Sequence, residues 1–147
     1  MPLTINETSM IKELNSILIE DDKYISISWA TLARTTPKLS QYFKEGNLSK
    51  IGNLNIYCYV GITKSHLNIV TLNALDVTRP TGKLSIPLYD IKNISIKNSF
   101  LKCSISFLFN NESFIIHWIK YSGGTGIKKQ KYYVQQFINF LTKRYSV

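Results

Sequence analysis

Residues 83–121 read KLSIPLYDIKNISIKNSFLKCSISFLFNNESFIIHWIKY. Apolar and polar side chains alternate here with a period of two, which is the pattern of strands buried on one face. The clearest run is Leu101–Phe109, in which every second residue is apolar. Asn110-Asn111 follows it, and asparagine tolerates the positive φ that a tight hairpin turn needs. The stretch therefore predicts an antiparallel meander.

The final strand of this meander has a different pattern. Residues 114–119 read FIIHWI, which is apolar on both faces of a strand. Such a run is typical of a strand that is covered on both sides. Alternation also predicts three earlier strands, at residues 24–32, 54–60 and 66–72, and in the first of them Ile25, Ile27 and Trp29 share one face. Residues 73–82 have the composition of a loop.

Two helices are expected outside the strands. Apolar residues at helical spacing predict one helix over about residues 8–20, capped by Thr8 or Ser9. A second apolar stripe predicts a helix over about residues 128–145, after the glycine-rich residues 122–126. No linker or repeat divides the chain, so residues 1–147 are expected to form a single, mainly β (α+β) domain.

The charge is the strongest anomaly of composition. The chain carries 18 basic and 9 acidic residues, a formal net charge of +9. From Lys23 onward there are 17 basic and four acidic residues, a net charge of +13. This imbalance favours an anionic partner such as phospholipid headgroups, nucleic acid or an acidic protein. The alternative is a lysine-rich surface that only keeps the protein soluble.

The sequence also bears on the cellular location of the protein and on the redox state of its two cysteines. No stretch has the apolar length of a membrane span, and the N-terminus lacks the pattern of a secretory signal. The cytoplasm is therefore the expected location, with peripheral association at the inner membrane surface as an extension. Cys58 and Cys103 fall within predicted strands, and we expect free, buried thiols there.

No catalytic or metal-binding pattern is evident. His66 and His117 lie in different predicted strands, and neither belongs to a Ser-His-Asp or Cys-His signature. In its apolar strand, His117 is expected to be a core or half-buried imidazole. Two histidines and two scattered cysteines are too few for a structural metal site. We therefore expect no enzyme activity, no metal and no cofactor.

Seven strands followed by an amphipathic helix resemble the pleckstrin-homology (PH) superfold, and short motifs are similar to its bacterial PH-like family. They are Ile86-Pro87-Leu88-Tyr89-Asp90-Ile91 before an isoleucine-rich strand, and the Gly61-Ile62-Thr63 step. The resemblance covers about residue 11 to the C-terminus. It implies a strongly bent, seven-stranded antiparallel sheet or barrel, capped by the C-terminal helix, with an extra N-terminal helix. The long segment 34–52 and the glycines of 122–126 depart from the family pattern.

The resemblance also implies a site. Lipid-binding PH domains use basic residues from the first two strands and the loop between them. The corresponding basic residues here are Arg34, Lys38, Lys44, Lys50 and Lys64, and Tyr42 and Phe43 are the expected membrane-facing residues. The familiar lysine and arginine spacing of phosphoinositide sites is not reproduced, which favours a diffuse electrostatic site. Tyr42 and Phe43 would otherwise pack the loop onto the core.

The expected function is a non-catalytic binding or scaffold domain for an anionic membrane surface or an acidic protein. One alternative is a homo-oligomeric module assembled through the sheet edges. Nucleic-acid binding is a third hypothesis, in which Tyr57, Tyr59, Tyr132 and Tyr133 would stack on bases, although no RNA-binding motif accompanies them.

Overall fold

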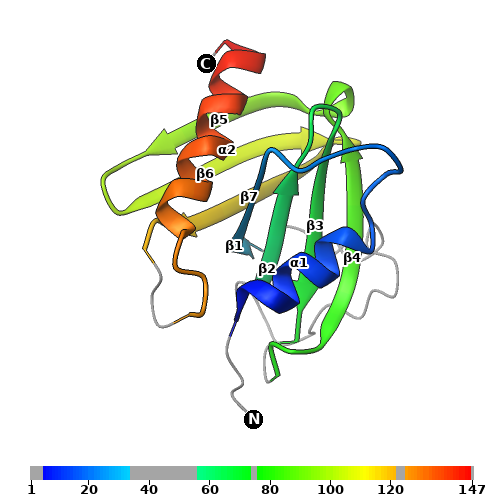
Figure 1. The fold of residues 1–147 in the computed structure, drawn as a ribbon. Coiled ribbons are helices and arrows are strands. Elements are labelled where there is room, and N and C mark those ends of the chain that lie inside the picture. Colours follow the sequence, from blue (N-terminus) through cyan, green and yellow to red (C-terminus); the bar gives the residue numbers. More distant parts are fainter. Residues whose placement is uncertain (1–4, 34–55, 74–75, 122–124, 147) are drawn as a thin grey trace.

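The structure is a computed structural model that describes residues 5–33, 56–73, 76–121 and 125–146. These residues contain seven strands and two helices (Figure 1). Their bounds are α1 Glu7–Asn15, β1 Ser26–Ala33, β2 Ile56–Ile62, β3 His66–Leu72, β4 Pro80–Pro87, β5 Lys92–Asn98, β6 Lys102–Phe109, β7 Glu112–Ile119 and α2 Gln130–Tyr145, with a short 3₁₀ turn at Leu88–Asp90. No helix in the described part of the chain is long and apolar enough to cross a membrane.

The seven strands form one antiparallel sheet in the order β4-β3-β2-β1-β7-β6-β5. Neighbouring strands are consecutive in the chain except for β1 and β7, which pair only over Thr31–Ala33. β4 and β5 are the two edges, so the sheet does not close into a barrel. The predicted architecture, a bent seven-stranded antiparallel sheet with a C-terminal helix and an extra N-terminal helix, is confirmed.

The meander and its turn follow the sequence pattern closely. Asn110 and Asn111 have φ angles of 51° and 64°, as the hairpin between β6 and β7 requires. The start of β4 was predicted wrongly, because β4 begins at Pro80 within the expected loop. Pro80 pairs with Leu72, and a proline is tolerated at the first residue of an edge strand, where its missing N–H costs little.

The inner face of the sheet holds the larger core, and α2 packs into it. Val134, Phe137, Ile138 and Leu141 are buried together with apolar residues of all seven strands. The ring centroids of Phe137 and Trp118 lie 4.8 Å apart, and both rings are buried. The prediction that α2 caps the sheet is therefore confirmed. Trp118 Nε1 donates to Ser28 Oγ at 2.8 Å in the same interior.

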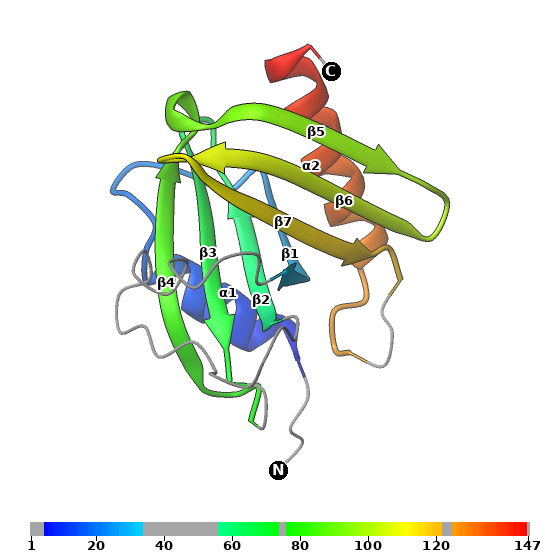
Figure 2. The same ribbon diagram turned by 180° about the vertical axis from the view of Figure 1, so that it is seen from behind.

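The outer face of the β1–β3 region carries a second core, which α1 covers (Figures 1 and 2). Met10 and Leu14 of α1 are fully buried, and they belong to the same cluster as Trp29 and Tyr59. β1 is therefore apolar on both faces, because Ala30 and Leu32 point into the inner core instead. Ile25 is exposed just before β1, although it was expected on the Trp29 face.

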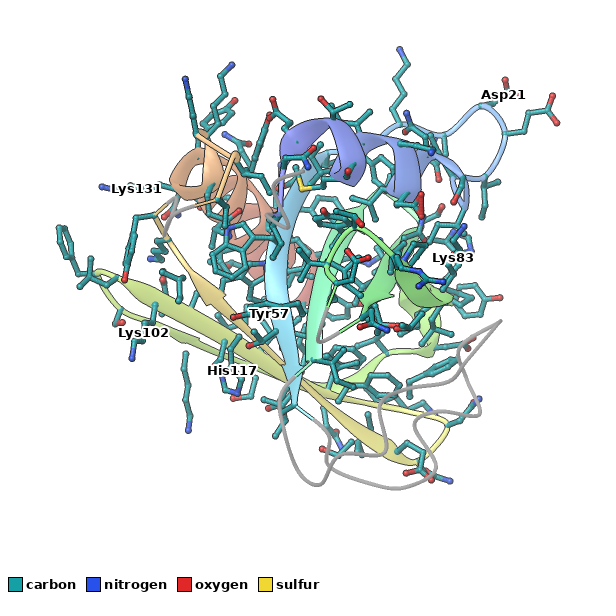
Figure 3. All side chains as sticks on the ribbon, turned by 90° about the horizontal axis from the view of Figure 1, so that it is seen from below. Asp21, Tyr57, Lys83, Lys102, His117 and Lys131 are labelled. Atoms are coloured by element: carbon teal, nitrogen blue, oxygen red, sulfur yellow. The ribbon has the colours of Figure 1, made fainter. Side chains whose placement is uncertain are left out.

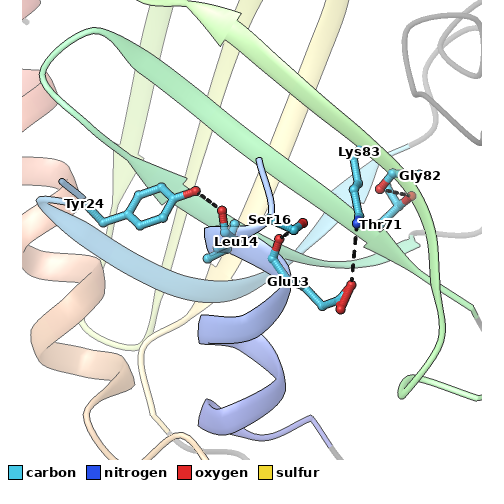
Figure 4. A network of polar contacts seen from close by, with 7 residues as sticks. All are labelled: Glu13, Leu14, Ser16, Tyr24, Thr71, Gly82 and Lys83. Atoms are coloured by element: carbon cyan, nitrogen blue, oxygen red, sulfur yellow. Dashed lines mark hydrogen bonds and ion pairs between the residues drawn. The ribbon is translucent and has the colours of Figure 1, made fainter. Parts of the chain in front are cut away.

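Polar contacts fasten α1 to the sheet (Figure 4). The Tyr24 hydroxyl donates to the carbonyl oxygen of Leu14, and Lys83 Nζ lies 4.0 Å from Glu13 Oε2. The ring of Tyr24 covers Gly61, where an added Cβ would lie 2.4 Å from a ring carbon. Glycine at position 61 is thus required by the aromatic ring that lies over it.

The prediction of the first helix needs two corrections, one at each end. Asn6, and neither Thr8 nor Ser9, caps α1, since its side chain accepts from Ser9 N at 2.9 Å. The helix ends at Asn15, five residues before the predicted end, and the chain continues in a tighter turn in which Ile17 N donates to Leu14 O at 3.3 Å. The Ser16 hydroxyl donates to the Glu13 carbonyl oxygen at 2.6 Å beside this turn.

β7 is covered fully on its inner face but only in part on its outer face, where Ile119 packs against the second core. Phe114, Ile116 and Trp118 are buried in the inner core, but His117 on the other face is exposed. The expectation of a core or half-buried His117 was therefore wrong. This outer face of β7 continues across β6 and β5, and α1 lies over the other half of the sheet.

Candidate functional site

An apolar pair stands at the tip of the β5–β6 hairpin. The Ser99 backbone N–H and hydroxyl both reach the carbonyl oxygen of Lys102, at 2.8 and 3.0 Å, which closes a tight turn around the two residues between them. Phe100 is 79% exposed and Leu101 is 51% exposed. Leu101 belongs to this turn and not to the strand that the alternation predicted. Two large apolar side chains thus face solvent on a tightly closed loop.

Two other segments contact this tip. Lys131 Nζ in the first turn of α2 lies 5.4 Å from the ring centroid of Phe100, a cation–π distance. The Lys120 backbone N–H donates to Leu101 O at 2.8 Å and so ties the end of β7 to the hairpin. We call the exposed residues of these segments the basic tip: Lys97, Phe100, Leu101, Lys102, Tyr121, Lys128, Lys129, Lys131 and Tyr132.

Part of the positive charge of the basic tip lies at the amino end of α2, where positive charge destabilises a helix. The first turn of α2 has no acidic residue and contains Lys131, while Lys129 is its N-cap residue and Lys128 directly precedes it. The amino end of a helix carries a partial positive charge and is stabilised by carboxylates. Residues that act against local stability in this way are often kept for function.

Among the described residues, Glu112 is remote from the tip and Glu7 is already engaged. Glu112 pairs with Phe109 while Lys102 pairs with Ile119, so they lie at opposite ends of the β6–β7 ladder. Along β6, Lys102 and Phe109 are seven residue steps apart, which is roughly 23 Å at 3.3–3.4 Å per residue. Glu7 Oε1 accepts from the Tyr133 hydroxyl at 2.7 Å. This bond raises the pKa of Tyr133 to about 12, because the neighbouring carboxylate holds the phenol proton.

A line of polar side chains crosses the outer face beside the tip. Lys97 pairs with Ser104, Ser104 with His117, and His117 with Thr31. We call these four residues the cross-strand row. Their neighbours along each strand, such as Cys103, Ile116 and Leu32, point into the inner core, so the row itself faces outward.

The cross-strand row lines a solvent-open recess of about 580 Å³. Asn98, Ser99 and Lys102 of the β5–β6 hairpin complete its polar lining. Cys103, Trp118 and Ile119 contribute to its wall. Figure 3 shows Lys102 and His117 on the same side of the molecule, with Lys131 near the end of the hairpin. The recess and the basic tip therefore share one hairpin.

Most of the site residues expected from the sequence cannot be placed. Arg34, Lys38, Tyr42, Phe43, Lys44 and Lys50 lie outside the described residues, so that part of the site stays a prediction. Lys64 is exposed in the β2–β3 turn. It lies at the end of β1 and β2 where Ser26 pairs with Ile62. The segment 34–55 joins the opposite ends of these strands, at Ala33 and Ile56.

The basic tip and the cross-strand row were not recognised in the sequence. The signal for the tip was the apolar pair Phe100-Leu101 directly after Asn98-Ser99, since Asn and Ser favour turns. That pair was attributed to a strand instead. The row has no local signal, because it depends on the register of four strands.

Among the described residues, Asp22, Ser65 and His66 lie together, but not in the order of a catalytic triad. Ser65 Oγ donates to Asp22 Oδ2 at 2.9 Å and contacts His66 Nδ1 at 2.8 Å. The serine thus stands between the acid and the imidazole, whereas a catalytic triad needs the imidazole in the middle. Burial raises the pKa of Asp22, but hydrogen bonds from Ser65 and Thr63 outweigh this and lower it overall.

Both thiols are unsuited to nucleophilic chemistry. Burial raises the pKa of Cys58, and it raises that of Cys103 to about 11 even though Lys120 opposes the shift. A thiol with a raised pKa is almost entirely protonated at neutral pH, and the thiolate is the reactive form. Within the described ranges, no group of three or more His, Cys, Asp or Glu residues is arranged to hold a metal ion.

Comparisons with known proteins bear on the fold alone. No protein-family model matches the sequence, and no curated protein matches it. Among solved structures, the chain is similar to the hSac2 domain from the human phosphoinositide phosphatase Sac2, with 13% sequence identity and a TM-score of 0.50. The match covers 92% of this chain and 77% of that chain. This likeness supports the bent, helix-capped sheet described above.

Proposed function

We propose that the protein is a non-catalytic, PH-like binding module whose basic tip docks on an anionic membrane surface. The observation that carries this proposal is Phe100 and Leu101, exposed on a closed turn, with Lys102 next in sequence and Lys131 against the ring of Phe100. An apolar pair of this kind enters the interface between headgroups and acyl chains, while the lysines remain at the level of the phosphates.

The expected energies are sufficient for reversible binding. A lysine near an anionic leaflet contributes about 1 kcal/mol, and the tip presents Lys97, Lys102, Lys128, Lys129 and Lys131. Fully burying a Phe or Leu side chain contributes about 1.5–3 kcal/mol. Binding should therefore have a salt-sensitive part from the lysines and a salt-resistant part from Phe100 and Leu101.

An acidic protein is a less favoured partner for the same surface. Its carboxylates would satisfy the lysines equally well, but the exposed ring of Phe100 would need a matching pocket. A membrane interface accepts an apolar side chain without shape complementarity. The vesicle experiment below separates the two partners.

The two other functional classes have less support. Edge-to-edge assembly is disfavoured by Pro80 and Pro87 in β4, and by exposed Lys92 and Lys97 with a register shift in β5, since prolines, lysines and bulges block strand pairing. For nucleic-acid binding, Tyr59 is only 1% exposed and the Tyr133 hydroxyl is bonded to Glu7. The four tyrosines therefore do not form a shared stacking surface.

The test is binding to vesicles of phosphatidylserine and phosphatidylcholine, measured by co-sedimentation. The variant Lys128→Glu, Lys129→Glu, Lys131→Glu changes the net charge by six at the basic tip. The control Lys12→Glu, Lys23→Glu, Lys92→Glu makes the same change at exposed positions of α1, the segment before β1 and the end of β5 that is remote from the tip. At about 1 kcal/mol per lysine, the tip variant should bind roughly a hundredfold more weakly or worse.

Phe100→Ser with Leu101→Ser tests the apolar part, because it keeps the charge unchanged. We expect weaker binding at low salt and almost none at 0.5 M salt, where charge attraction is screened. Equal weakening by the tip and control triples would show that only global charge matters. A wild-type protein that does not bind these vesicles at low salt would refute membrane docking and leave an acidic protein as the partner to seek.

A further inference from the structure

We propose that the recess beside the basic tip binds a phosphate monoester, and that in the cell it selects lipids with such a headgroup. The inference rests on the proposed membrane docking for its lipid source. The class of ligand, a phosphate monoester, follows from the polar side chains of the recess and does not depend on membrane docking.

The recess gathers donors for an anion in one place. Lys97 and Lys102 supply two ammonium groups, His117 an imidazole, and Ser99, Ser104 and Thr31 three hydroxyls. The register spaces the members of the cross-strand row at about 5 Å between neighbouring strands. Lysine is a mobile point charge that follows a phosphate oxygen, and hydroxyls donate to the remaining oxygens.

The balance of charge favours a monoester over a diester. No carboxylate is among the lining residues, which carry two formal positive charges. A phosphate monoester carries about −1.5 to −2 charges at neutral pH and offers three free oxygens. A diester carries one charge and offers two free oxygens, so it leaves one lysine uncompensated.

The position of the recess fits a lipid headgroup. Lys97, Ser99 and Lys102 belong to the hairpin that carries Phe100 and Leu101 at its turn. When the turn enters the interface, these residues lie at its edge, at the depth where headgroup phosphates are found. The volume of about 580 Å³ also lies within the range of roughly 300–1,000 Å³ that small-molecule sites occupy.

The first experiment uses soluble probes. Methyl phosphate and dimethyl phosphate are titrated into the folded protein, and amide shifts are followed by ¹H–¹⁵N NMR. Methyl phosphate should shift the amides of residues 97–104 and 117, and dimethyl phosphate should bind at least about tenfold more weakly. Equal affinities, or shifts that do not include these residues, would overturn the inference.

Matched variants identify the site. Lys97→Met and Lys92→Met each remove one exposed lysine from β5, at opposite ends of the strand. Lys97→Met should weaken methyl phosphate binding about tenfold or more, and Lys92→Met less than twofold. His117→Gln, which keeps a donor but cannot become cationic, should have an intermediate effect. Equal effects of the two lysine variants would mean that the anion senses only overall charge.

The vesicle arm separates the lipid from a free phosphate compound. Vesicles with phosphatidate, a monoester lipid, are compared with phosphatidylserine vesicles of equal surface charge. We expect wild type to prefer phosphatidate, and Lys97→Met to lose this preference while still binding phosphatidylserine. If methyl phosphate binds but no vesicle does, the recess serves a soluble phosphate monoester, and both lipid selection and the docking function are refuted. If vesicles bind without preference and methyl phosphate causes no shifts, docking stands and the recess inference falls.

Discussion

The side-chain amide of Gln130 makes hydrogen bonds to both the backbone N–H and the backbone carbonyl of Trp29, as a neighbouring strand would. Its Oε1 accepts from Trp29 N at 3.3 Å, and its Nε2 donates to Trp29 O at 2.8 Å. The same Nε2 donates to Ile119 O at 3.1 Å, so one amide joins β1 to β7 where their ladder has already ended. β1 and β7 are no longer hydrogen-bonded to each other at this point, so these backbone groups would be buried and unpaired without Gln130.

Replacing this glutamine should cost much more than replacing an exposed one. Gln130→Ala leaves three backbone groups without their partner, and each unsatisfied buried group costs about 1–3 kcal/mol. We expect a loss of several kcal/mol in urea unfolding. The control is Gln135→Ala, since Gln135 is exposed and bonds only to Asn139 in the same helix. Its effect should stay within about 0.5 kcal/mol, and a similar effect of both variants would contradict the structural role of Gln130.

The contact of Phe137 with Trp118 gives a second prediction. Phe137→Ala removes a fully buried ring from the inner core, which typically costs about 3–5 kcal/mol. The emission of Trp118 should change as well, because its ring loses a neighbour. Tyr132→Ala on the exposed side of the same helix is the control, and it should leave stability nearly unchanged. A stable Phe137→Ala protein would argue against α2 as a structural part of the core.

The bond between Tyr133 and Glu7 predicts a loss of stability at alkaline pH. The pKa of Tyr133 is raised from 10.0 to about 12 in the folded protein, mainly by this hydrogen bond. A raised folded-state pKa stabilises the protein below pH 10, and that contribution disappears as the pH rises toward 12. The free-energy advantage of wild type over Tyr133→Phe should therefore be constant up to about pH 10 and then shrink.

Phenolate absorbance supplies an independent measurement of this bond. Glu7→Gln removes the charge that holds the proton, so one tyrosine should titrate at lower pH than in wild type. Tyr24, Tyr59 and Tyr145 also have raised pKa values, and they are common to both proteins. An advantage over Tyr133→Phe that persists unchanged through pH 11 would contradict the assignment.

The strands could be predicted where every second side chain faces the core. The bounds of β3 agree with the alternation, and the paired asparagines marked the β6–β7 turn. The alternation was less informative for β1, because Trp29 and Leu32 are buried in different cores on opposite faces. Periodicity shows that a residue is buried, but it does not show which element covers it.

The candidate site was less predictable, for a physical reason. Lys97, Ser104 and His117 are separated in sequence and become neighbours only through strand register. Register depends on the turns as well as on the strands, and a shift by one residue would turn each side chain to the other face. The role of Gln130 was equally hidden, because a polar residue before an apolar stripe is ordinarily a helix-start residue exposed to water.

The hydrogen bond between Ser28 and Trp118 has a consequence for biosynthesis. The two residues are 90 positions apart, and Ser28 is translated first. At about 5–20 residues per second, a ribosome adds Trp118 roughly 5 to 18 seconds after Ser28. β1 therefore leaves the ribosome long before β7 and α2 exist to cover its inner face. During that interval the nascent chain exposes an apolar strand, and we expect chaperones that hold unfolded chains to act on it then.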